Sequence, residues 1–98
     1  MIYLISYDLY HPGQGYARLY DGIKELGAWW HYLDSTWLVD TNLTTSQIFE
    51  RLRSRIDASD RLLIIGVRRD YSGWLPGDAW NWINGRARRR IDHPGAIR

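Results

Sequence analysis

The chain has no cysteine among its 98 residues. This absence excludes thiol catalysis, thiolate zinc sites and iron–sulfur clusters, and it leaves no disulfides to stabilise a small secreted domain. Long apolar runs are also missing, since Leu62 to Val67 is far shorter than the roughly 20 residues of a membrane span. Residues 1–5 lack the basic segment that begins a secretory signal. We therefore expect a cytoplasmic protein without a transmembrane helix.

Several familiar catalytic motifs are absent too. The sequence contains no glycine-rich phosphate loop, no nucleophile elbow and no paired-histidine metal helix. The three histidines, His11, His31 and His93, are scattered along the chain. Most common enzyme classes are therefore not expected.

Charge is unevenly distributed in what the length predicts to be one small domain. The net charge is +2, but residues 86–98 carry +4 and residues 1–85 carry −2. We interpret residues 1–85 as the folded domain and residues 86–98 as a basic C-terminal tail. Twelve of the thirteen basic residues are arginine, which suits bidentate phosphate contacts, although such a tail can equally be a solvated terminus.

Hydrophobic periodicity predicts six elements. Alternating or continuous apolar residues predict strands at 2–9, 28–33, 36–41 and 62–67, with Asp34-Ser35 as a two-residue hairpin turn. Helical spacing predicts one helix within 14–26 and a second from Thr44, whose capping box with Gln47 marks its start, ending before Asp57. Residues 79–83 fit a short strand by alternation or a short helix capped by Asp78.

The order strand, helix, strand, strand, helix, strand predicts an α+β fold of the ferredoxin-like βαββαβ type, with a C-terminal extension. Both helices would cover one face of a four-stranded antiparallel sheet and leave the other face open. Six Trp and seven Tyr are too many to lie under two short helices. We expect the open face to form a homodimer, with the extension contributing; the alternative is a stacking platform for single-stranded nucleic acid.

Asp8 is the candidate catalytic and metal-binding residue. It ends the first strand, and a carboxylate held by a rigid central strand can bind a hard cation such as Mg²⁺. One carboxylate alone makes a poor site, but a two-fold dimer could bring two copies together. The alternative is that Asp8 caps the turn at residues 10–12.

Other polar residues are weaker candidates. His11 could serve as an accessory proton donor or phosphate contact near Asp8, or be simply exposed. Asp34 and Asp40 are more consistent with turn and strand-end positions, and His31 with packing. Large aromatic side chains could stack on bases but are more typical of a core or interface; these are Tyr3, Trp29, Trp30, Trp37, Trp80 and Trp82.

Four segments in matching order carry a family resemblance. They are the first strand with Tyr7-Asp8, the helix end Leu26-Gly27, residues 34–38 around Ser35-Thr36-Trp37, and residues 60–64. Over about residues 1–67 the chain resembles the CRISPR-associated protein 2 superfamily, most closely its stand-alone SinR-like branch, which is related to VapD-type toxin ribonucleases.

The resemblance implies a ferredoxin-like homodimer, and in some members an endonuclease for RNA or DNA in which the aspartate matching Asp8 binds Mg²⁺ at the dimer axis. Other members are non-catalytic bridges that hold duplex DNA between integrase subunits. This sequence differs at Trp29-Trp30-His31, at Asp34 where glutamine is usual, and in its Trp-rich stretch from 74 to 82. These differences count against an integrase partner.

We therefore expect a homodimeric, Mg²⁺-dependent endonuclease in which arginines hold the nucleic-acid backbone. The alternatives are a non-catalytic nucleic-acid-binding dimer of the same fold and a protein-interaction module with a Trp-rich surface. The sequence does not rank the candidate backbone contacts, which are Arg18, Arg51, Arg53, Arg55, Arg68, Arg69, Arg86, Arg88, Arg89 and Arg90.

Overall fold

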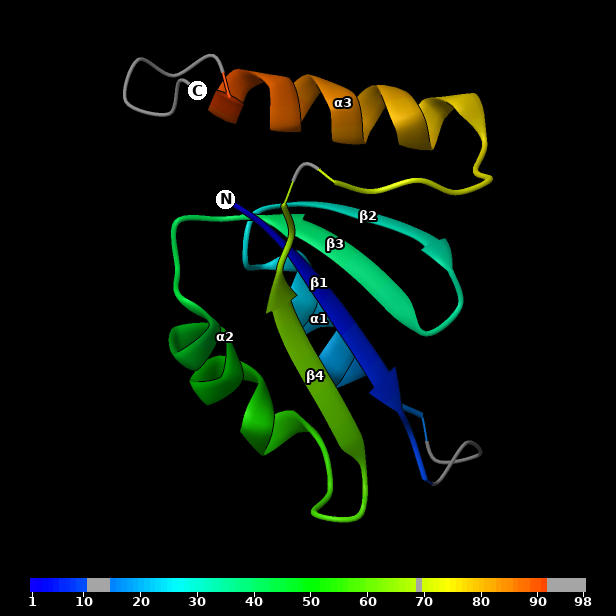
Figure 1. Ribbon diagram of the computed structural model, residues 1–98. Coiled ribbons are helices and arrows are strands. Elements are labelled where there is room, and N and C mark those ends of the chain that lie inside the picture. The colour runs from blue at the N-terminus through cyan, green and yellow to red at the C-terminus, as the bar shows by residue number, and fades with distance from the viewer. Residues whose placement is uncertain (11–14, 69, 92–98) are drawn as a thin grey trace.

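A four-stranded antiparallel sheet and three α-helices make up the α+β fold of the computed structural model (Figure 1). It describes the backbone of residues 1–10, 15–68 and 70–91, and the side chains of these residues up to 86. The elements are β1 (Ile2–Asp8), α1 (Ala17–Lys24), β2 (Ala28–Leu33), β3 (Thr36–Asp40), α2 (Thr45–Leu52), the 3₁₀ turn η1 (Arg53–Arg55), β4 (Arg61–Gly66) and α3 (Gly77–Ile91).

Strand β1 lies inside the sheet, in the order β2-β3-β1-β4. It pairs antiparallel with β3, where Leu4 faces Leu38, and with β4, where Asp8 faces Arg61. Strands β1 and β2 therefore run in the same direction with β3 between them. All four strands were predicted from the sequence, with ends that differ by one residue at most.

Local signals account for the hairpin and for the start of α2. Leu33 and Thr36 pair directly across the Asp34-Ser35 turn, as predicted. The Thr44 side chain accepts from the Gln47 backbone N–H at 3.2 Å, and the Gln47 side chain accepts from the Thr44 N–H at 2.9 Å. This is the predicted capping box, and it satisfies backbone donors that the first helical turn leaves unpaired.

Helices α1 and α2 cover one face of the sheet and enclose the main core. Trp37 and Ile5 from the sheet are almost fully buried there with Ile23 of α1 and Ile48 of α2. Phe49, next to Ile48 on α2, is 42% exposed. The core therefore rests on the i and i+4 positions Ile48 and Leu52.

Helix α3 partly covers the opposite face, which was expected to be open. Its Ala79 and Ile83 pack on Ile2, Trp30 and Leu38 in a second, smaller core. Figure 1 shows α3 crossing the end of the sheet where the N-terminus lies. The extension is thus the helical alternative of the two considered, because Ala79 and Ile83 share one helical face.

The helix continues past Gly85 into the arginine-rich segment as far as Ile91. Residues 92–98 of the predicted tail lie outside the described part of the chain. None of the helices in the described ranges has the length and apolar character needed to cross a membrane.

Candidate functional site

Asp8 lies at the C-terminal end of the central strand β1 and is exposed. Alternation along the strand places it with Leu4 and Ser6, on the face that α3 covers at its other end. Among the described residues, its carboxylate takes part in no hydrogen bond or ion pair. The described residues therefore leave the Asp8 carboxylate available to bind a ligand.

The Tyr10 backbone just after β1 is held by a different carboxylate, Asp60. Its Oδ1 accepts from the Tyr10 backbone N–H at 2.7 Å and from the Tyr16 hydroxyl at 3.0 Å. Its Oδ2 accepts from the Asp57 N–H at 2.8 Å, and the residue is only 7% exposed. The cap considered for Asp8 at Tyr10 is therefore made by Asp60, which sequence reasoning missed. A buried carboxylate of this kind anchors the backbone that follows Asp8.

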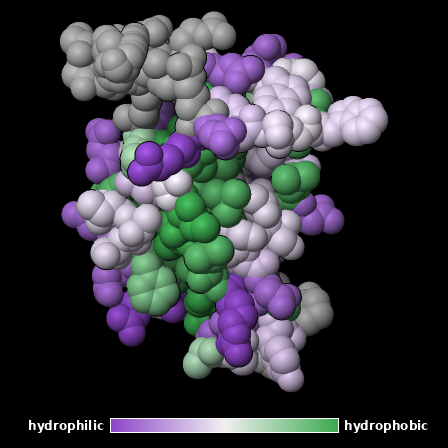
Figure 2. Space-filling view, in the orientation of Figure 1, coloured by the Kyte–Doolittle hydropathy of each residue, from purple (hydrophilic) through white to green (hydrophobic). Residues whose placement is uncertain are grey.

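An apolar strip lies on the same face as Asp8. We call Leu4, Leu63 and Ile65 the open strip; Leu63 is 54% and Ile65 49% exposed, and Leu4 is half-buried. Figure 2 shows a green band of hydrophobic residues along the middle of the molecule, in the region of β1 and β4. Ser6 and Thr36 lie beside it, with their hydroxyls 3.3 Å apart. The strip ends at the paired positions Asp8 and Arg61.

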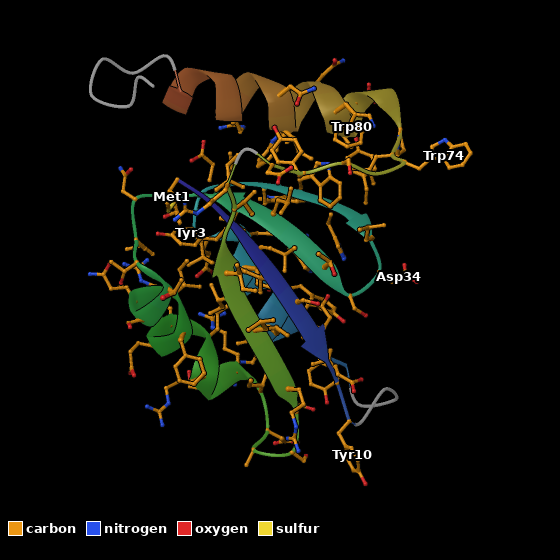
Figure 3. All side chains as sticks on the ribbon, in the orientation of Figure 1. Met1, Tyr3, Tyr10, Asp34, Trp74 and Trp80 are labelled. Atoms are coloured by element: carbon orange, nitrogen blue, oxygen red, sulfur yellow. The ribbon has the colours of Figure 1, made fainter. Side chains whose placement is uncertain are left out.

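Asp8 lies at the end of the open strip away from α3, whereas Leu4 at the other end also packs against the smaller core under α3. Figure 3 shows Tyr10, two residues after Asp8, at the opposite end of the sheet from Met1 and Trp80. The half of the face nearest Asp8 is therefore the half that α3 leaves uncovered.

Four predicted arginines lie on the helical side of the molecule. Arg51 and Arg53 are exposed at the end of α2 and in η1. The guanidinium of Arg55 donates to the backbone oxygen of Arg18 at 2.8 Å. Arg18 and Arg55 also line an open cavity of about 400 Å³ beside the start of α1. These arginines are thus separated from Asp8 by the thickness of the sheet.

The remaining predicted arginines have varied positions. Arg68 is exposed just after β4. Arg86 forms an ion pair with Asp40 at 2.9 Å and lies 4.7 Å from the ring centre of Trp82, so it fastens α3 to the sheet. The other predicted sites, His11, Arg69 and the side chains of Arg88, Arg89 and Arg90, lie outside the described residues.

Arg61 is the cation nearest Asp8 in the strand register, and the predicted set does not include it. Its Cα pairs with that of Asp8 across β1 and β4, and its side chain is exposed. Its Nη1 donates to the backbone oxygens of Ser59 at 3.2 Å and Asp60 at 3.3 Å. Only the strand register brings Asp8 and Arg61 together, because they are 53 positions apart in the sequence.

Most of the aromatic candidates are packing residues. Tyr3, Trp30 and Trp37 are buried, and the indole N–H of Trp37 donates to the Tyr7 hydroxyl at 2.9 Å. The ring of His31 stacks on Trp37 with centres 3.8 Å apart, as its packing interpretation predicts. Trp74 differs, since it is 99% exposed and projects from the segment before α3 (Figure 3).

Burial raises the pKa of the Tyr7 phenol above its ordinary value of 10.0, and the hydrogen bond from Trp37 partly opposes this. The Tyr7 hydroxyl also donates to the Asp34 backbone oxygen at 3.4 Å. Tyr7 is thus a neutral structural group that joins the core to the hairpin turn, on the face opposite Asp8.

The described residues of one copy of the chain offer few ligands for a metal ion. No cluster of three or more His, Cys, Asp or Glu residues occurs in the part of the chain that the structure describes. Asp8 alone supplies one carboxylate, so the Mg²⁺ implied by the resemblance fits only if a second copy contributes its own Asp8. No model of a known protein family matches the chain.

Proposed function

We propose that the chain is a homodimeric, metal-dependent endonuclease that cleaves RNA or DNA phosphodiesters. The observation that carries the proposal is the state of Asp8, a carboxylate that is exposed at the end of the central strand and has no partner among the described residues. An exposed carboxylate on a rigid strand beside an uncovered apolar strip is suited to a site that a second copy completes.

The fold supports the family resemblance on which the activity depends. Support for a ferredoxin-like plan comes from the βαββαβ order of the first six main elements and from the packing of α1 and α2 on one face of the sheet. Tyr7-Asp8 stands at the end of β1, where the resemblance to the CRISPR-associated protein 2 superfamily implies the metal-binding aspartate.

Each part of the proposed site has a separate role. The two Asp8 carboxylates would hold Mg²⁺ at the dimer axis. When bound, Mg²⁺ supplies Lewis-acid polarisation of a phosphodiester and a more acidic attacking water. Asp60 holds the Tyr10 backbone and so fixes the end of β1 at which Asp8 stands.

Cleavage assays with labelled single-stranded RNA and duplex DNA test this function. Parent protein and Asp8→Asn are compared in Mg²⁺ and in EDTA, because asparagine keeps the size of the side chain but removes its charge. We expect cleavage by the parent in Mg²⁺ only, and none by Asp8→Asn. Equal cleavage by both proteins, or none by the parent on either substrate, would contradict the proposal.

The helical side favours one alternative, a dimer that binds nucleic acid without cutting it. Arg18, Arg51, Arg53 and Arg55 belong to α1, α2 and η1 on that side of the sheet, and phosphate contacts by arginine need no metal. Binding would then persist in EDTA, weaken steeply with salt and survive Asp8→Asn. The double variant Arg51→Ala/Arg53→Ala would weaken it and reduce its salt dependence.

A further inference from the structure

Two opposite charges stand side by side at the end of the open strip. Asp8 and Arg61 occupy directly paired positions on adjacent strands, and alternation directs both side chains to the face that carries Leu63 and Ile65. Both are exposed, and no ion pair joins them to each other. Arg61 uses Nη1 for two backbone oxygens, which leaves its other two nitrogens for a further acceptor.

This arrangement is complementary to itself. A two-fold axis that runs parallel to the strands, between β1 and β4 and in the contact plane of two facing sheets, puts each Asp8 opposite the Arg61 of the other copy. The same rotation lays one open strip on the other, so apolar surface meets apolar surface. A partner that carried one sign of charge there would leave either Asp8 or Arg61 facing a like charge.

We propose that a second copy of this chain docks on the open strip and that Asp8 and Arg61 form reciprocal ion pairs across the two-fold axis. This inference rests on the homodimer of the proposed function and adds the contact that sets its register. Arg61 is then an interface residue, and it offsets the repulsion between two nearby Asp8 carboxylates. The dimer consequently forms without any metal ion.

Charge exchange tests the pairing without reference to nuclease activity. Dimer dissociation constants are measured by sedimentation equilibrium in EDTA for the parent, Asp8→Arg, Arg61→Asp and the double exchange. Each single variant places like charges together and should weaken the dimer about tenfold or more. The double exchange restores opposite charges and should return the constant to within about threefold of the parent.

Three further variants keep the test informative. Arg53→Asp changes an exposed arginine on the helical side and should leave the dissociation constant unchanged. Asp8→Asn and Arg61→Gln remove charge without reversing it, so each should weaken the dimer by less than the corresponding reversal. They replace the reversals if far-UV circular dichroism shows that a reversed protein does not fold.

Each contrary result has a distinct meaning. A parent dimer that neither single reversal weakens, or a double exchange that does not recover, overturns the ion pairs and leaves the homodimer standing. A parent that remains monomeric at the highest soluble concentration overturns both the pairing and the dimeric site. If the protein dimerises as expected but cleaves nothing, only the proposed function is overturned, because sedimentation equilibrium measures the dimer and not the cleavage.

Discussion

At the scale of single residues, Asp60 is the carboxylate that holds the described backbone on either side of residues 11–14. It is buried and accepts from Tyr10, Tyr16 and Asp57. Asp60→Ala removes three hydrogen bonds, one of them buried, so we expect the free energy of unfolding to fall by about 2–4 kcal/mol. Urea unfolding measures this value.

The matched control is Asp21→Ala, because Asp21 is an exposed acidic residue on α1. It should change stability by no more than about 0.5 kcal/mol. Asp60→Asn keeps one acceptor oxygen, so its loss of stability should lie between those of Asp60→Ala and Asp21→Ala. Equal effects of Asp60→Ala and Asp21→Ala would show that Asp60 does not hold the backbone on either side of residues 11–14.

Tyr7 predicts how stability changes in alkaline solution. Burial raises its pKa above 10.0, so the folded chain retains a proton that the unfolded chain releases. The contribution of Tyr7 to the free energy of unfolding is fully present below pH 10.0, the ordinary pKa, and is lost as pH rises through the pKa of the folded chain. The loss is at most about 1.4 kcal/mol per pH unit. Urea unfolding between about pH 9 and pH 11 measures the loss.

Tyr7→Phe supplies the comparison. It lowers stability at neutral pH by about 1–3 kcal/mol, because the buried Trp37 indole N–H loses its acceptor. Its stability should then decline less than that of the parent above about pH 10. Parallel declines in the two proteins would mean that Tyr7 is not the group responsible.

At the scale of elements, Gly27 joins α1 to β2 at a close backbone approach. A Cβ at this position would overlap the backbone oxygen of Asp40 on β3. Gly27→Ala should therefore lower the free energy of unfolding by about 1–3 kcal/mol, measured by urea unfolding. Gly85→Ala on α3, where a Cβ meets nothing within 4 Å, should be neutral or stabilising by up to about 1 kcal/mol. The reverse order would contradict this packing.

An element can be predicted from the sequence when the residues that determine it are neighbours in the sequence. The hairpin and the start of α2 are set by neighbouring residues, Asp34-Ser35 and the Thr44–Gln47 capping box, and both were predicted. Residues 79–83 fit strand and helix alike. What favours the helix is tertiary, because Ala79 and Ile83 pack on Trp30 and Arg86 pairs with Asp40.

The residues of the candidate site also differ in whether a local sequence signal identifies them. Asp8 could be identified because a strand end is visible in the sequence. Asp60 and Arg61 were missed because their partners lie about 50 residues earlier, at Tyr10 and Asp8, and only strand pairing brings them together. The one local signal for Asp60 was its spacing of three from Asp57, whose backbone N–H it accepts.

At the scale of the whole molecule, the sheet separates two surfaces of different character. One side carries helices with exposed arginines, and the other carries α3, the open strip and Asp8. A dimer formed through the open strip places both copies of Asp8 between the subunits and leaves α1 and α2, with their exposed arginines, on the outside. The proposed active site therefore exists only in the dimer.

The most direct test measures Mg²⁺-dependent cleavage per chain as the protein is diluted, with light scattering reporting the fraction of particles at twice the 11.6 kDa mass of the chain. We expect cleavage per chain to fall in step with the dimer fraction, and Asp8→Asn to be inactive at every concentration. Cleavage per chain that stays constant while the dimer dissociates would contradict a site shared between two copies.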